Sequence, residues 1–134
     1  MRFVFDTNVI VSAALLPSST PAQALMKAEH MGVLLYSDAT LEELINVLER
    51  PKLKPYIKQD YIKDFYARVR INWEHISIIQ RITACRDVKD DKFLEVAING
   101  SASTLISGDN DLLTLNPYNE LNIITPADFL ESVS

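Results

Sequence analysis

One cysteine, three glycines and two histidines are present among 134 residues, and each shortage excludes a class of site. The lone thiol of Cys85 cannot form an internal disulfide, which fits a packed residue in the reducing cytoplasm. Three glycines are too few for a glycine-rich phosphate-binding loop. His30 and His75 have no second histidine or cysteine at ligand spacing, so the sequence does not predict a zinc site.

Long apolar runs are missing as well. No stretch approaches the roughly 20 apolar residues of a membrane-spanning helix, so no membrane partner is expected. With 48% hydrophobic and 23% charged residues, the chain fits a single globular domain over residues 1–134.

Charge is distributed unevenly along the chain. The formal net charge is -5 and the sequence pI about 4.9, which argues against a general nucleic-acid coat. Residues 50–70 nevertheless carry seven basic and two acidic side chains. This basic stretch either guides a phosphate backbone or forms the solvated face of a helical hairpin, and the sequence leaves both interpretations open.

Hydrophobic periodicity indicates strands that alternate with helices. Short apolar runs predict buried strands at residues 3–5, 33–36, 76–79, 104–106 and 122–125. Helical spacing predicts helices at residues 20–31, 38–48, 59–72 and 90–99, and one more from Pro126. Thr20 is the expected cap of the first helix, and Gly100 the expected left-handed end of the fourth. The order predicts an α/β fold, a three-layer α/β/α sandwich with a mainly parallel central sheet.

Acidic residues follow the predicted strands. Asp6 ends the first strand, and Asp109 and Asp111 follow the strand at 104–106. Asp90 and Asp91 stand at the start of a predicted helix, where an acid also has a simpler role beside the helix dipole. Because ligands of open α/β sheets bind beyond the carboxyl ends of the strands, we expect these groups to converge there. Gathered carboxylates repel one another unless a cation neutralises them.

The helix after Ser37 adds a further acid. On its helical wheel Glu42 belongs to a polar, solvated face, whereas Glu43 lies in line with Ala39 and Val47 on a partly apolar stripe. An acid on such a stripe needs a partner, which favours Glu43. A site of carboxylate oxygens suits a hard divalent cation, Mg²⁺ or Mn²⁺.

Four segments, in this order, resemble the PIN-domain family over essentially the whole chain. They are Phe5-Asp6-Thr7-Asn8-Val9, Leu41-Glu42-Glu43-Leu44 with the following Leu48-Glu49-Arg50-Pro51-Lys52, Asp87-Val88-Lys89-Asp90-Asp91-Lys92-Phe93-Leu94, and Ser107-Gly108-Asp109-Asn110-Asp111. The chain is also similar to the branch that contains the toxins of toxin–antitoxin pairs. This resemblance implies a metal-dependent endoribonuclease that leaves a 5'-phosphate and a 3'-hydroxyl.

The resemblance also implies roles for individual residues and partners. Asp6, Glu43, Asp91 and Asp109 correspond to the catalytic, metal-holding acids, with Asp111 as an auxiliary ligand and Asn8 and Ser107 as supporting groups. Either Asp90 or Asp91 fills the third place, and the downstream Phe93, Leu94 and Ala97 favour Asp91. The implied cofactor is Mg²⁺ or Mn²⁺. The implied partners are an RNA substrate, a cognate antitoxin and a second copy in a homodimer.

Other interpretations differ in the residues that they require. A haloacid-dehalogenase-like phosphatase needs a second aspartate two residues after the first, where this chain has Asn8. A receiver-type signalling module needs a lysine near its end, and no lysine follows Lys92. A catalytically silent PIN-like module that binds a metal or a partner remains the alternative.

Overall fold

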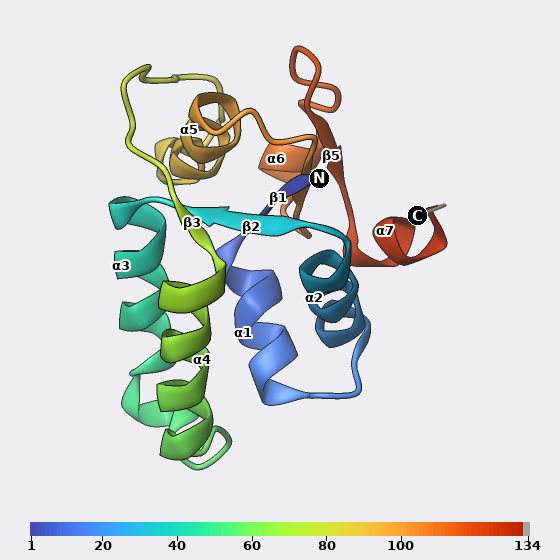
Figure 1. Ribbon diagram of the computed structural model, residues 1–134. Helices are drawn as coiled ribbons and strands as arrows, with labels where there is room; N and C mark the ends of the chain where they lie inside the picture. The colour runs from blue at the N-terminus through green and yellow to red at the C-terminus, as the bar shows by residue number, and fades with distance from the viewer. Residues whose placement is uncertain (133–134) are drawn as a thin grey trace.

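The computed structural model describes residues 1–132 and has three layers, a central sheet between two groups of helices (Figure 1). The strands are β1 (Arg2–Phe5), β2 (Val33–Tyr36), β3 (Glu74–His75), β4 (Thr104–Ile106) and β5 (Asn122–Ile124). Their order is β3-β2-β1-β4-β5, and every pairing is parallel. The predicted α/β/α sandwich with a parallel sheet is therefore confirmed.

Helices cover both faces of this sheet (Figure 1). One layer consists of α1 (Thr7–Leu15), α2 (Thr20–Met31), α3 (Asp38–Leu48) and α4 (Gln59–Asn72), and α7 (Pro126–Glu131) packs against α2. The other layer consists of α5 (Asp91–Asn99) and α6 (Asn110–Leu113). Two short 3-10 segments, η1 (Pro51–Leu53) and η2 (Val88–Asp90), follow α3 and precede α5.

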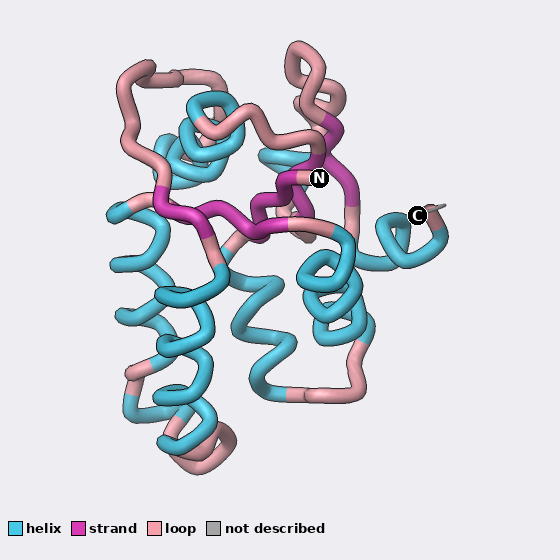
Figure 2. Tube along the Cα trace, in the orientation of Figure 1, coloured by secondary structure: helices cyan, strands magenta, loops and turns pink. Residues whose placement is uncertain are grey.

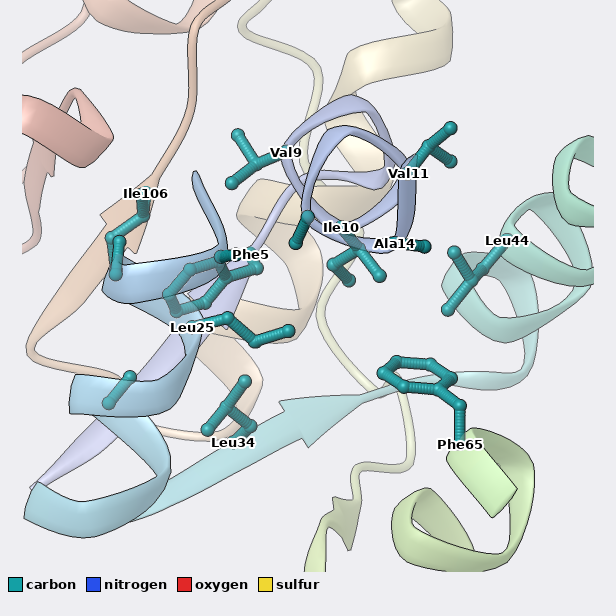
Figure 3. Close-up of a cluster of buried hydrophobic side chains, with 14 of the residues drawn as sticks. Phe5, Val9, Ile10, Val11, Ala14, Leu25, Leu34, Leu44, Phe65 and Ile106 are labelled. Carbon is teal, nitrogen blue, oxygen red and sulfur yellow. The ribbon is translucent and has the colours of Figure 1, made fainter. Parts of the chain in front are cut away.

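Alternate residues of the strands fill two separate cores. Phe3 and Phe5 of β1 belong to the core with α1, α2, α3 and α4, whereas Val4 between them belongs to the core with α5. Figure 3 shows Phe5, Leu25 and Leu34 among the side chains of the first core. Strands buried on both faces read as continuous apolar runs, which is why the sequence indicated them.

In the described part of the chain no single helix is long and apolar enough to cross a membrane, and α1 with α2 passes that test only as a pair bent by 110°.

Local sequence signals mark most helix boundaries correctly. Ser37 caps α3 in a capping box, because its hydroxyl accepts from the Thr40 N–H at 3.2 Å and the Thr40 hydroxyl accepts from the Ser37 N–H at 2.9 Å. The cap of α2 is Ser19 instead of the predicted Thr20, which is the first residue of the helix. Helices α1 and α6, which the periodicity did not indicate, follow the short turns after strands β1 and β4, and their N-caps are Asp6 and Asp109.

Two local predictions are wrong. Residues 76–79 form no strand, since β3 ends at His75 and the exposed Ile79 donates its N–H to the Asn99 side chain at 3.0 Å. Gly100 has a φ of -95°, and the left-handed residue after α5 is Ser101 with a φ of 54°. A side chain at position 100 would lie 2.6 Å from the Leu35 side chain, so close packing and not φ explains the glycine.

The segment from residue 76 to residue 87 forms a long loop beside α5 (Figure 2). Three polar side chains one turn apart on α5, those of Asp91, Glu95 and Asn99, accept hydrogen bonds from its backbone. Glu95, for example, accepts from the Ile82 N–H at 3.0 Å and is buried. These side chains replace a neighbouring strand as the partners of the loop backbone, which satisfies its buried polar groups.

The sheet topology sets the position of a site. After β1 the chain adds β2 and β3 on one side, and β4 and β5 then pair on the other side of β1. The connections from the neighbouring strands β1 and β4 therefore leave in opposite directions and open a crevice at their carboxyl ends. Asp6 follows β1 and Ser107 follows β4, so both residues lie at this switch point.

Candidate active site

Asp6 lies at the centre of the crevice and is held by two donors. It is the N-cap of α1 and accepts from the Val9 N–H at 2.9 Å, while the Ser107 hydroxyl donates to its other oxygen. The residue is only 4% exposed. Burial raises the pKa of Asp6, the nearby Asp109 raises it further, and the two donors only partly offset these effects. Asp6 is thus an oriented carboxylate in surroundings that disfavour its charge.

A tight turn after β4 directs the next acids into the same crevice. The Ser107 hydroxyl, which donates to Asp6, also accepts from the Asp109 N–H at 3.0 Å. The Asp109 side chain in turn accepts from the Asp111 N–H at 2.8 Å and caps α6. Ser107 therefore links the two strand ends.

Asp90 completes a cluster of carboxylates. Asp90, Asp109 and Asp111 each offer one oxygen, and these oxygens lie within 4.8 Å of one another. Burial, together with the negative charges of Asp109, Asp87 and Asp111, raises the pKa of Asp90 to about 6. Such a shift is expected where carboxylates are brought together without a compensating cation.

Asp91 does not reach this cluster. Its carboxylate accepts from the Cys85 N–H at 2.8 Å and the Ala84 N–H at 3.1 Å, and only 8% of the residue is exposed. Burial raises the pKa of Asp91, but the two backbone donors outweigh burial and hold the pKa below its ordinary value. At the third acidic position the geometry thus favours Asp90 over Asp91, the reverse of the preference drawn from the sequence.

Glu43 lies on the same cavity but is already paired. One carboxylate oxygen is 2.8 Å from the Lys92 ammonium and the other accepts from the Thr7 hydroxyl. Glu42, by contrast, is exposed, as the helical wheel predicted. Sequence reasoning missed Thr7 and Lys92. A signal for Lys92 was present, because a cation in the first turn of a helix opposes the helix dipole and therefore needs an acidic partner.

These groups surround a hollow of about 160 Å³, which we call the acidic cavity. Its lining consists of Asp6, Thr7, Asn8, Glu43, Val47, Arg50, Asp90, Phe93 and Asp109. A larger hollow of about 420 Å³, between α1, α2 and α4, shares none of these residues. Convergent carboxylates, and not volume, therefore identify the candidate site.

The donor set fits a hard divalent cation. The clustered side chains offer carboxylate oxygens, and the acidic cavity is lined by neither histidine nor cysteine. The nearby thiol is not a candidate ligand or nucleophile, because burial and the Asp91 carboxylate raise the pKa of Cys85 to about 12.

Comparisons with known proteins identify the family and the fold. A family model described as a PIN domain matches residues 2–111. An uncharacterised protein of Methanocaldococcus jannaschii is 30% identical over 144 residues, which cover 98% of this chain and 90% of that protein. A chain in the crystal structure of VapBC2 from Rickettsia felis, bound to a DNA fragment from their promoter, has the same fold. The TM-score is 0.63 at 17% identity, over 93% of this chain and 98% of that one. The family match confirms the resemblance seen in the sequence, and the chain belongs to the PIN-domain family.

Proposed function

We propose that the protein is a divalent-metal-dependent endoribonuclease that hydrolyses phosphodiester bonds of RNA. The observation that carries this proposal is the set of four carboxylates, those of Asp6, Asp90, Asp109 and Asp111, at the carboxyl ends of β1 and β4. The raised pKa values of Asp6 and Asp90 support it, because burial and the neighbouring negative charges both disfavour the ionised carboxylates, and a bound cation offsets both effects. Membership in the PIN-domain family supports the same activity.

We assign Mg²⁺ or Mn²⁺ as the cofactor. Asp6 and Asp109 are the proposed central ligands, with Asp90 and Asp111 beside them. The bound cation supplies charge neutralisation at the phosphoryl oxygens and lowers the pKa of an attacking water. A hydrolase of this kind releases a 5'-phosphate and a 3'-hydroxyl.

The remaining polar residues either position these acids or contact water and substrate. The Ser107 hydroxyl donates to Asp6 and accepts from the Asp109 backbone, so one side chain fixes the relation between the two central ligands. Glu43 is neutralised by Lys92, and we propose that it orients water or substrate at the edge of the cavity. Asn8 lines the cavity beside Asp6 and offers an uncharged amide to the substrate.

We further propose a toxin of a toxin–antitoxin pair, active in the cytoplasm as a homodimer. The likeness of the fold to a chain in the VapBC2 crystal structure supports a cognate antitoxin as partner. Co-expression with the product of the neighbouring reading frame, followed by co-purification, tests for that partner, and light scattering on the purified protein measures the oligomeric state.

The activity itself is tested by adding the purified protein to unstructured and structured RNA, with a chelator or with Mn²⁺. We expect cleavage with Mn²⁺ and none with the chelator, because without the cation the acidic cavity repels a phosphate. Analysis of the product ends should find 5'-phosphates. Binding of Mn²⁺ without cleavage of any RNA would instead support a silent metal-binding module.

The neighbours Asp90 and Asp91 give a matched pair of variants for calorimetry in chelator. Asp91→Ala leaves two backbone N–H groups without an acceptor, so we expect the free energy of unfolding to fall by about 1–3 kcal/mol. Asp90→Ala removes a repelling charge and should raise the melting temperature at neutral pH. Addition of Mn²⁺ should stabilise Asp91→Ala as it does the parent, but not Asp90→Ala. The reverse metal response would restore Asp91 as the third ligand.

The pH dependence of the two variants should also differ in sign. Asp91 has a lowered folded-state pKa, so its contribution to stability is present above its unfolded pKa and is lost as the pH falls through the folded value. Asp90 has a folded-state pKa raised from 3.8 to about 6. Its contribution is therefore present below the unfolded pKa and is lost as the pH rises through about 6. Calorimetry at pH values from below 3.8 to above 6 measures both trends.

A further inference from the structure

The acidic cavity is the middle of three connected hollows. On one side it shares Glu43, Val47 and Arg50 with a hollow of about 370 Å³ along α3, which we call the α3-side hollow. On the other side it shares Asp6, Asn8 and Asp109 with a hollow of about 280 Å³ beside α1, the α1-side hollow. A chain of nucleotides whose scissile phosphate lies over the acids therefore has space on both sides of the cut.

The two outer hollows differ in charge. The lining of the α3-side hollow contains two cations, Arg50 and Lys92, beside the acids Glu42 and Glu43. The described lining of the α1-side hollow contains acids, Asp6 and Asp109, but neither lysine nor arginine. The α1 side offers small and uncharged groups instead, such as those of Ser12, Pro21 and Pro126. A polyanionic substrate thus meets cationic side chains on one side of the acids only.

Of the two cations, Arg50 is the one left for a substrate. The Lys92 ammonium is paired with Glu43 at 2.8 Å, but Arg50 takes part in none of the ion pairs found within residues 1–132. Its backbone is fixed, since its N–H donates to the Val47 carbonyl at 3.2 Å and Pro51 begins η1 directly after it. An anchored arginine with a free guanidinium is suited to a phosphate, which it can bind through two parallel hydrogen bonds.

The position of Arg50 also relates it to the acids. Glu43, Val47 and Arg50 follow one another at intervals of four and three residues, so they lie on one line along α3 and just beyond its end. All three border both the acidic cavity and the α3-side hollow. Among the members of the basic stretch, Arg50 alone lines these two hollows.

We propose that Arg50 binds the phosphate next to the scissile one on the α3 side, so that the enzyme holds its substrate by charge on one side of the cut only. This inference rests on the proposed ribonuclease activity. The other basic side chains of residues 50–70 contribute a general attraction, whereas Arg50 recognises one particular phosphate. Lys92 neutralises Glu43 beside it, which keeps a negative charge away from that phosphate.

Neutral linkages in the substrate test the proposal. Short RNAs, each with one methylphosphonate in place of a phosphate, are compared by their kcat/KM values with Mn²⁺, around a cleavage position mapped on the unmodified RNA. For the parent we expect kcat/KM to fall roughly three- to tenfold when the neutral linkage lies next to the cut on one side. It should change little when the neutral linkage lies next to the cut on the other side. Arg50→Gln should cleave the unmodified RNA more slowly and lose this one-sided sensitivity.

Two further variants separate recognition from general attraction. Lys58→Gln removes the same charge from an exposed position of the basic stretch and should keep the parent's one-sided pattern. Arg50→Lys should retain part of it, because the charge remains while the two-pronged hydrogen bonding is lost. Equal sensitivity on both sides, or an Arg50→Gln protein with the parent's pattern, would overturn this inference alone. A parent that cleaves no RNA would overturn the proposed function as well.

Discussion

Purified Asp6→Asn protein is expected to be folded but to cleave RNA about 100-fold more slowly than the parent, or not at all. Asparagine keeps an oxygen that accepts from the Val9 N–H, so the cap of α1 survives the change. What disappears is the negative charge at the point where the carboxylates of both strand ends meet. Cleavage assays with Mn²⁺ measure the loss, and circular dichroism checks the fold.

Glu120→Gln is the matched control for Asp6→Asn. It also removes one carboxylate charge, but from an exposed residue before β5 that lines none of the three hollows, so cleavage should remain within about twofold of the parent. Undiminished cleavage by the Asp6→Asn protein would contradict the assignment of the active site. Equal losses in the two variants would contradict it too, because the loss would then not depend on where the charge lies.

The fold could be predicted from the sequence because its strands are buried on both faces. β2 is an unbroken apolar run, and β1 and β4 are apolar after their first residues, Arg2 and Thr104. The helices between them have regular apolar stripes, so local pattern and global architecture agree. The positions of the central acids could be predicted by the same reasoning. Once the strands are parallel, Asp6 and Asp109 must lie at the same edge of the sheet.

Neighbouring residues on a helix could not be separated in the same way. Asp90 and Asp91 are both acidic at the start of α5, and only the position of the loop at residues 76–87 decides which carboxylate is used by its backbone. That loop has no periodic pattern, and it was interpreted as containing a strand. The hydrogen bonds that Asp91 accepts depend on tertiary structure, so the sequence could not show that this carboxylate is occupied by the loop, and the resemblance favoured Asp91.

A second large effect is expected from Asp109→Asn, and it acts on stability instead of catalysis. In the metal-free parent, the charge of Asp109 raises the pKa values of both Asp6 and Asp90. Removal of this charge should therefore stabilise the metal-free protein at neutral pH, by roughly 2–6 °C in melting temperature for about 1 kcal/mol of relieved repulsion. Asparagine still accepts from the Asp111 N–H, so the turn after β4 is preserved.

The sign of this effect depends on pH. Because the folded-state pKa of Asp90 is raised from 3.8 to about 6, the folded parent binds more protons than the unfolded chain within that range. The site's contribution to the parent's stability is thus present below the unfolded pKa and is lost as the pH rises through the folded one. The advantage of Asp109→Asn should accordingly be absent at low pH and should develop as the pH rises through about 6.

Calorimetry of the parent and Asp109→Asn, first in chelator and then with Mn²⁺, tests most directly whether the gathered carboxylates form a cation site. A cation that binds only the folded state stabilises it by RT ln(1 + [L]/Kd), about 2.7 kcal/mol at a concentration of 100 Kd. We expect Asp109→Asn to melt above the parent in chelator and to lose most of the stabilisation that Mn²⁺ gives the parent. A variant that melts at or below the parent in chelator, and responds to Mn²⁺ as the parent does, would contradict the cation site.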